Sequence, residues 1–122
     1  MAKSFAQLRS KPSYKKFLKS LRDLDPAGWA AAVDKEEGFI ILTSEVAGRF
    51  CPIRFCPITA ACFAQTSQYY GVGEARLAAR DIGLRSVRFK IINAADRLKP
   101  YDRRIRRSLL RAVAHLRPEN RS

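Results

Sequence analysis

The chain has 122 residues, with 24 Lys and Arg against 11 Asp and Glu, so its formal net charge at pH 7 is +13. Hydrophobic residues make up 47% of the chain, and seven Phe and four Tyr are among them, which excludes disorder as the main state. No apolar run approaches the roughly 18–20 residues that cross a bilayer, so the composition excludes a transmembrane protein. The first seven residues also lack the apolar stretch of a signal peptide, and we expect one cytoplasmic domain.

The positive charge is distributed unevenly along the chain. Residues 1–22 hold seven bases and no acid, residues 23–46 hold six acids and one base, and residues 97–122 hold nine bases and two acids. Arg outnumbers Lys by 16 to 8, and its planar fork of donors matches phosphate or carboxylate. We therefore expect a polyanionic partner, namely DNA, RNA, a nucleoprotein complex or an acidic protein. The alternative is an Arg-rich surface that serves only solubility.

The N-terminal part predicts an arm followed by a helix. We expect a flexible basic arm at 1–11, a single helical domain at 12–117 and a frayed tail at 118–122. Pro12 suits the first position of a helix. Apolar residues then recur at helical spacing, at Tyr14, Phe17, Leu18, Leu21 and Leu24. The opposite face carries four bases, which we name the first basic patch: Lys15, Lys16, Lys19 and Arg22.

The next segment predicts a short helix and a hairpin. Asp25 as a cap and Pro26 at a first helical position favour a helix through Trp29 and Val33 that ends at Gly38. Residues 39–43 are apolar and rich in β-formers, which predicts a strand. Residues 49–55 can return antiparallel to it, with Pro52 confining this second strand to an edge. The pattern thus predicts one small β-hairpin at about residues 39–55.

The remaining elements are expected to be helices. Residues 57–64 are apolar all round, which is typical of a buried helix. A helix over 74–82 is expected to end with Gly83 in the left-handed conformation and Leu84 after it. A further helix should begin at a Ser86 cap and stop at Pro100, and Asp102 should cap the last one. The fold class that we predict is mainly α, a compact helical domain with one small β-hairpin.

The last predicted helix carries four exposed bases, the third basic patch: Arg103, Arg104, Arg107 and Arg111. At about 100° per residue these four fall within a quarter-turn of one another. His115 follows them, and we expect it to act as a cation near the last carbonyls of this helix.

Cysteine usage indicates a reducing compartment and no metal. Cys51, Cys56 and Cys62 form an odd set without a secretion signal. Their spacings and the single His115 do not match a zinc site, so we interpret them as small buried hydrophobes. The acids at 34, 36, 37 and 45 could converge as nuclease ligands, but a solvated face that pairs with the protein's own bases explains them better. We find no catalytic motif and expect no enzyme, no cofactor and no metal.

Residues 75–92 have the form of a helix, a Gly-centred turn and a helix. Ala79 suits the position where the helices cross, and Leu84, Phe89 and Ile92 suit the packing set of the second helix. The second basic patch, Arg85, Arg88 and Lys90, falls at the start of that helix. In these respects the segment resembles the helix-turn-helix of DNA-binding proteins. The resemblance implies that Arg85 and Arg88 contact bases or phosphates and that Lys90 contacts phosphate.

Four short segments, at 56–60, 82–84, 94–96 and 106–110, are similar to small uncharacterised proteins of phages and prophages. That likeness implies an interaction protein with a host or nucleoprotein target. Our prediction from the sequence is nucleic-acid or nucleoprotein binding, mainly through phosphate contacts of the three patches. The alternative is an inhibitor or adaptor that binds an acidic protein surface. A helix at the N-terminus that lies on anionic lipid is a third possibility, with no integral membrane association.

Overall fold

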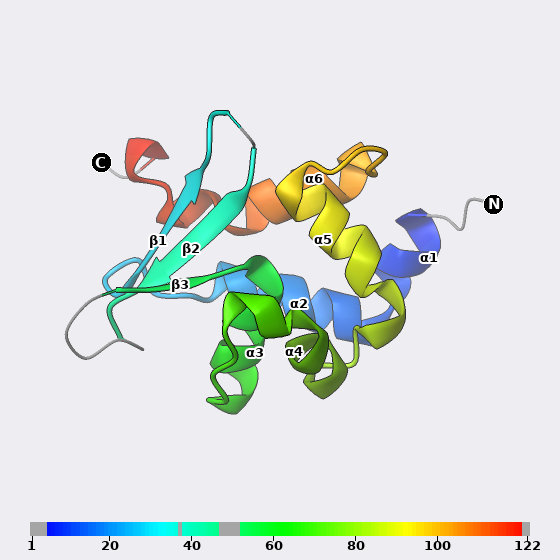
Figure 1. The fold of residues 1–122 in the computed structure, drawn as a ribbon, viewed down its shortest axis with the longest axis horizontal. Helices are drawn as coiled ribbons and strands as arrows, with labels where there is room; N and C mark the ends of the chain where they lie inside the picture. Colours follow the sequence, from blue (N-terminus) through cyan, green and yellow to red (C-terminus); the bar gives the residue numbers. More distant parts are fainter. Residues whose placement is uncertain (1–4, 37, 47–51, 121–122) are drawn as a thin grey trace.

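The computed structural model describes residues 5–36, 38–46 and 52–120 of the chain. The helices are α1 (Phe5–Ser10), α2 (Pro12–Arg22), α3 (Pro57–Thr66), α4 (Ala75–Asp81), α5 (Arg88–Asp96) and α6 (Arg103–Ala112) (Figure 1). The strands are β1 (Trp29–Val33), β2 (Ile40–Ser44) and β3 (Ile53–Phe55). Single 3₁₀ turns are η1 (Val72–Glu74), η2 (Arg85–Val87), η3 (Ala114–Leu116) and η4 (Pro118–Asn120). The predicted fold class, mainly α with a small sheet, is confirmed.

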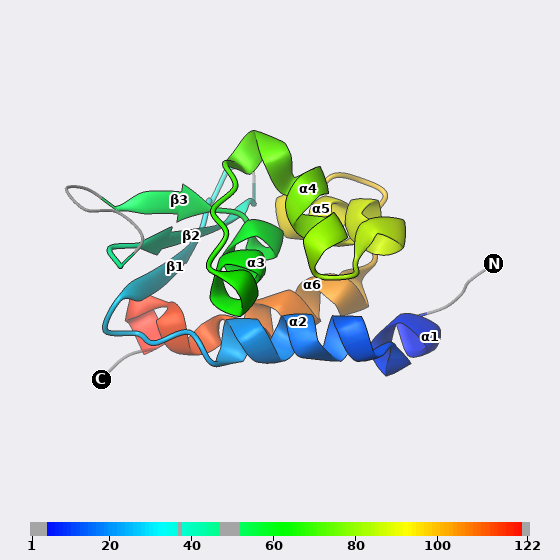
Figure 2. The ribbon, with the colours of Figure 1, turned by 90° about the horizontal axis from the view of Figure 1, so that it is seen from below.

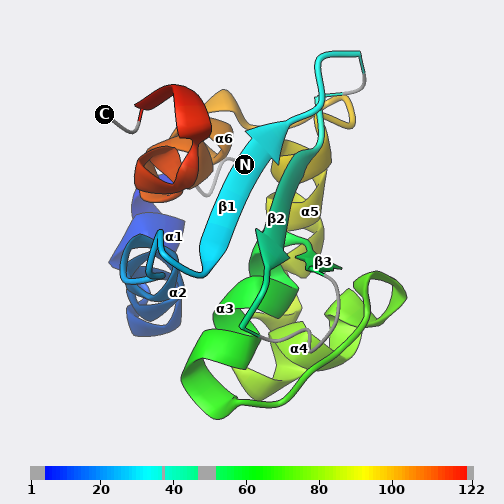
Figure 3. The same cartoon turned by 90° about the vertical axis from the view of Figure 1, so that its left-hand side faces the viewer.

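The helices form two groups, and the sheet lies at one end of them. Helices α2 and α6 pack side by side, while α3, α4 and α5 lie on the other side of the molecule (Figures 2 and 3). The sheet has the antiparallel order β1-β2-β3, and η3 and η4 pack against β1. This arrangement places the start of α1 and the α4–α5 turn at the end of the molecule remote from the sheet (Figure 1).

The core forms where the apolar stripes of the helices meet. Tyr14, Phe17 and Leu21 of α2 have no exposed surface, and neither does Leu109 of α6. Burying a side chain of this size stabilises a fold by roughly 1.5–3 kcal/mol. Pro12 stands at the start of α2 as predicted, so the expected apolar face of this helix is the buried face.

The predicted helix through Trp29 and Val33 is wrong, because these residues form β1. Trp29 pairs with Ser44 and Ala31 pairs with Leu42 across the sheet. The Trp29 ring packs 5.1 Å from the Phe55 ring, centroid to centroid. These long-range contacts and the ladder hydrogen bonds outweigh the local helix propensity of the alanines. Asp25 caps a turn instead, since its carboxylate accepts from the amide of Ala27 at 2.9 Å.

The predicted hairpin exists, as β2 and β3, within a larger sheet. Leu42 pairs with Phe55, and Ser44 pairs with Ile53. The expected second strand began at residue 49, but residues 49–51 lie outside the described part of the chain. The sheet is therefore a three-stranded meander whose first strand the sequence pattern assigned to a helix.

Parts of the predicted arm and of the predicted tail form helical turns instead. Residues 5–10 form α1, and Leu8 within it is buried against the core. Residues 118–120 of the predicted tail form η4, next to an ion pair between Arg117 and Glu119. Burial of the Leu8 side chain holds α1 against the core. The basic charge of this segment had instead favoured a flexible arm.

Two predicted boundaries of α5 also differ. Ser86 lies inside η2 and makes no cap, and α5 begins at Arg88. The helix ends at Asp96, four residues before Pro100, because Arg97 adopts the left-handed conformation with a φ of 59°. Leu98, which the predicted helix would have included, lies beyond the end of α5 and is 49% exposed.

The end of α4 follows the prediction in detail. Gly83 has a φ of 76°, the amide of Leu84 donates to the carbonyl of Ala79 at 2.8 Å, and the amide of Gly83 donates to the carbonyl of Arg80 at 3.3 Å. These two bonds define a Schellman ending. A Cβ at Gly83 would lie 3.3 Å from the Cβ of Ser13 in α2. The turn between α4 and α5 is thus fixed both by its backbone and by its contact with α2.

Replacing Gly83 by Ala should destabilise the protein by about 1 kcal/mol or more, because a residue with a Cβ is strained at positive φ. Gly73→Ala is the matched control, since a Cβ there meets no described atom within 4 Å and φ is not in the left-handed range. Denaturant unfolding of the two variants and the wild type measures the difference. Equal midpoints for the two variants would contradict the left-handed turn.

Candidate nucleic-acid interface

Four arginines from three consecutive elements surround one hollow of the surface. Arg76 and Arg80 come from α4, Arg85 from η2 and Arg88 from α5. They line a hollow of about 300 Å³ together with Leu77. The Gly83 turn brings the two helices together and so gathers bases that are 12 residues apart in sequence. We name these four residues the arginine cluster.

Half of the arginine cluster was missed by the sequence reasoning. The second basic patch named Arg85 and Arg88, which are in the cluster, and Lys90, which is exposed on α5 but does not line the hollow. Arg76 and Arg80 were left out. The signal was present in their spacing of four residues, which places both on one face of a helix.

Phe89 lies at the edge of the arginine cluster and is 63% exposed. Its expected role as a packing residue of the second helix is therefore wrong. The buried stripe of α5 runs through Ile91, Ala94 and Ala95, and Phe89 lies two residues before it, on the opposite face. The guanidinium carbon of Arg88 lies 4.4 Å from the centre of the Phe89 ring, so the ring holds this cation at the surface. Ala79 and Leu84 are fully buried, as expected for such a helix pair.

One acid lies beside the arginine cluster. The guanidinium of Arg80 contacts the carboxylate of Asp81 at 3.1 Å, and the hydroxyl of Tyr70 donates to the same carboxylate at 2.6 Å. The Tyr70 hydroxyl, together with Arg80, lowers the pKa of Asp81. The same hydrogen bond raises the pKa of Tyr70. Asp81 therefore stays ionised at neutral pH and offsets the charge of Arg80.

The N-terminal end of the chain adds bases next to the arginine cluster. The ammonium group of Lys11 lies 3.4 Å from the hydroxyl of Ser86 in η2. The Phe5 ring lies between two cations, with the guanidinium carbon of Arg104 at 5.2 Å from its centre and that of Arg9 at 6.0 Å. We name this set the basic end: Arg9, Lys11, Arg76, Arg80, Arg85, Arg88 and Arg104. Helix α1 and the start of α6, which carry Arg9 and Arg104, lie at the right in Figure 2.

The first and third basic patches cover the outer faces of α2 and α6. Their eight side chains are exposed: Lys15, Lys16, Lys19, Arg22, Arg103, Arg104, Arg107 and Arg111. Because α2 and α6 pack together, the two patches lie on neighbouring helices of the same helix layer. Lys19 is paired with Asp23 and Arg104 with Asp102, and Asp102 also caps α6 as predicted, by accepting from the Arg104 amide at 2.8 Å. Six of the eight bases therefore have no acidic partner among the described residues.

The acids of residues 23–46 form no cation site among the residues that the structure describes. No group of three or more His, Cys, Asp or Glu side chains within the described ranges is arranged to hold an ion. Glu37 and Cys51 lie outside those ranges. Nor does any helix of the described chain reach the length and apolarity that crossing a membrane requires.

Cys56, Cys62 and His115 have structural contacts. Cys62 is buried, and burial raises the pKa of its thiol, in line with its expected role as a small hydrophobe. Cys56 has a role that the sequence reasoning missed, since it caps α3: the Thr59 amide donates to its sulfur, and its own amide donates to the Thr59 hydroxyl at 3.0 Å. His115 Nε2 lies 2.9 Å from the carbonyl of Leu24, so this residue connects η3 to the end of α2.

Replacing Tyr70 by Phe should raise the pKa of Asp81 towards that of an ordinary carboxyl, because it removes the hydroxyl that stabilises the ionised form. Arg80 should retain part of the shift. A carboxyl-carbon NMR titration measures the pKa, with Tyr101→Phe as a control that should leave Asp81 unchanged. An Asp81 pKa that is the same in the Tyr70→Phe variant as in the wild type would show that the hydrogen bond is not formed in solution.

Comparisons of the chain with protein-family models, with curated proteins and with solved structures gave no significant match. The arrangement of side chains is therefore the basis for any statement about function.

Proposed function

We propose that this protein binds nucleic acid through the phosphate backbone and that the basic end is the primary contact surface. The observation that carries the proposal is the convergence of the arginine cluster on one hollow. Within it, Asp81 offsets one of four cations. The remaining positive charge has no ionised partner in the described part of the chain, and a phosphate group would supply one.

Arginine is well suited to binding phosphate groups. Its guanidinium can donate two parallel hydrogen bonds to phosphate oxygens, and it is charged at every physiological pH. Each phosphate that is neutralised releases condensed counterions, which provides much of the binding free energy. A net charge of +13 would also steer the protein towards a polyanion before contact.

The exposed Phe89 favours a partner with accessible bases. An aromatic side chain among cations is the usual arrangement in proteins that bind single strands, where a base stacks on the ring while the phosphates contact the cations. Duplex DNA keeps its bases stacked and offers only phosphates to the same surface. We therefore expect RNA or single-stranded DNA to bind more tightly than a duplex of equal length.

Base-specific reading is not part of the proposal. The exposed uncharged polar side chain just before α5 is Ser86 of η2, and it is in contact with Lys11. The helix-turn-helix likeness of residues 75–92 accordingly contributes the placement of cations and not a sequence code.

Because the cysteines Cys56 and Cys62 are free thiols, a cytoplasmic, reducing compartment is part of the same proposal.

Titration with fluorescent single-stranded and duplex oligonucleotides tests the proposal. Affinity should fall steeply between about 50 and 200 mM salt, with a log–log slope near −0.7 per phosphate contact for single strands and −0.9 for duplexes. Replacing Arg85 and Arg88 by Ala should weaken binding at low salt by about tenfold or more, and should reduce the magnitude of the slope by between one and two.

The matched control is Lys35→Ala with Lys99→Ala, which removes two exposed bases outside the basic end. This variant has the same net charge as the arginine variant and should lose much less affinity. No binding of the wild type to either oligonucleotide at low salt would overturn the proposal. Affinity pull-down after nuclease treatment that retains an acidic protein would favour the adaptor alternative instead.

A further inference from the structure

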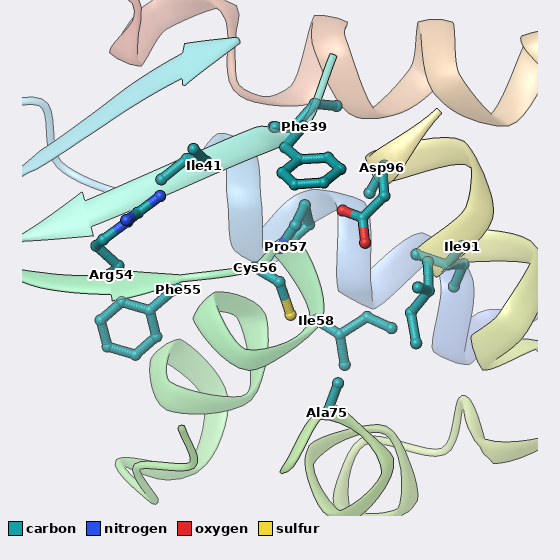
Figure 4. A pocket seen from close by; sticks show the side chains of 13 residues that line it. Phe39, Ile41, Arg54, Phe55, Cys56, Pro57, Ile58, Ala75, Ile91 and Asp96 are labelled. Carbon is teal, nitrogen blue, oxygen red and sulfur yellow. The ribbon is translucent and has the colours of Figure 1, made fainter. Parts of the chain in front are cut away.

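A cavity of about 470 Å³ lies where the sheet meets α3 and α5. Its volume falls within the usual range for small-molecule sites. The walls come from the start of β2, from β3 and the start of α3, from the first residue of α4, and from the second half of α5 (Figure 4). The residues that matter for the argument are Phe39, Ile41, Ile58, Ile91 and Asp96. No residue of the basic end lines this cavity, so it is separate from the proposed nucleic-acid interface.

Asp96 gives the apolar cavity one acidic group. Its carboxylate points into the space between the Phe39 ring and Ile91 (Figure 4). No hydrogen bond or ion pair to this carboxylate occurs in the described part of the chain, although the side chain is half-buried. Burial raises the pKa of Asp96 above its ordinary value, and the positive charge of Arg106 offsets only part of that rise. A buried acid without a direct partner costs stability unless a ligand provides one.

Arg106 approaches Asp96 but is engaged elsewhere. Its Nη1 atom donates to the carbonyls of Ala94 and Ala95, at 3.0 and 3.2 Å. From the neighbouring helix α6, it thereby provides hydrogen-bond donors to carbonyls in the last turn of α5, which have no partner within the helix. The charge of Arg106 favours the ionised form of Asp96, while its hydrogen bonds are directed to the backbone. The carboxylate oxygens consequently remain available to a group that enters the cavity.

The Asp96 carboxylate, the Phe39 ring and the aliphatic walls together determine which kind of ligand the cavity can bind. An ammonium group is attracted both by a carboxylate and by the face of an aromatic ring, and Asp96 and Phe39 offer these side by side. The aliphatic walls would bury an apolar body attached to it. An anionic ligand would meet the like charge of Asp96. Arg54 lies on the other side of Ile41 from this carboxylate (Figure 4).

We propose that this cavity binds a small organic amine, with the ammonium group on Asp96 and the apolar part between Phe39, Ile58 and Ile91. The site would work independently of nucleic-acid binding. It is assigned by the juxtaposition of an unpartnered carboxylate, an aromatic ring and an apolar cavity of ligand size.

The test uses 2-phenylethylamine as the probe and 2-phenylethanol as its uncharged counterpart, followed by amide NMR at neutral pH. The amine should shift the signals of residues such as Ile58, Ile91 and Asp96. It should bind about tenfold more tightly than the alcohol, which is the difference a charge-assisted hydrogen bond provides. Equal affinity of the two probes, or shifts confined to residues outside the cavity, would overturn the proposal.

Asp96→Asn removes the charge while keeping the shape, and should abolish the preference for the amine while changing the affinity for the alcohol less than about twofold. Glu45→Gln is the matched control because it removes one exposed carboxylate outside the cavity, and it should change neither affinity. If Asp96→Asn does not give a folded spectrum, Ile41→Trp, which adds bulk at a half-buried wall, should weaken both probes. Unchanged amine binding in whichever variant folds would refute the site.

Discussion

The packing of α2 against both α3 and α6 is the interaction on which the rest of the structure depends. Its three fully buried side chains, Tyr14, Phe17 and Leu21, fill the space between α6 and α3. Polar contacts then attach other elements to the same helix. Gln65 of α3 donates to the Ser20 hydroxyl at 3.0 Å, and His115 reaches the Leu24 carbonyl. The position of the α4–α5 turn is set from the same helix, through Ser13.

This packing also decides where the positive charge can lie. Each helix has one face committed to the core, so the bases occupy the faces that remain in water. Several of them stand at helix beginnings, such as Arg103 and Arg104 in the first turn of α6. Positive charge there is unfavourable because the helix N-terminus is itself positive. In α6 the carboxylate of Asp102 offsets this repulsion. At the other helix beginnings that carry bases, a bound anion would offset it in the same way.

The sequence predicted helices with clear boundaries and failed where long-range contacts decided the outcome. Pro12, Pro57 and the Gly83 turn mark boundaries by local geometry, so they could be located from the residues alone. β1 could not, because three alanines in succession carry little of the alternation that marks a strand. The contact of Trp29 with Phe55 becomes visible only once the sheet is formed.

The sequence indicated that exposed arginines would form the candidate site, but it did not indicate which arginines lie together. An excess of Arg at helix surfaces could be read directly, and Arg85 and Arg88 were identified. Arg76 and Arg80 joined them through the turn angle between α4 and α5, which spacing along the chain does not contain. The opposite error concerns Phe89, whose hydrophobic character suggested burial, although its position relative to Ile91 places it outside. The cavity around Asp96 had no sequence signal, because its walls come from four stretches of the chain: 39–41, 54–58, 75 and 91–96.

Trp29 is the one tryptophan of the chain, and its surroundings give the protein a built-in optical reporter. The indole is almost fully buried and packs on Phe55 at 5.1 Å and on Phe63 at 6.3 Å. It therefore senses the junction of the sheet with α3. Phe55 also lines the cavity that contains Asp96, so a molecule bound there would contact a ring that packs on the fluorophore. The intrinsic emission of the unlabelled protein thus reports on this junction, and events at the remote basic end should leave it unchanged.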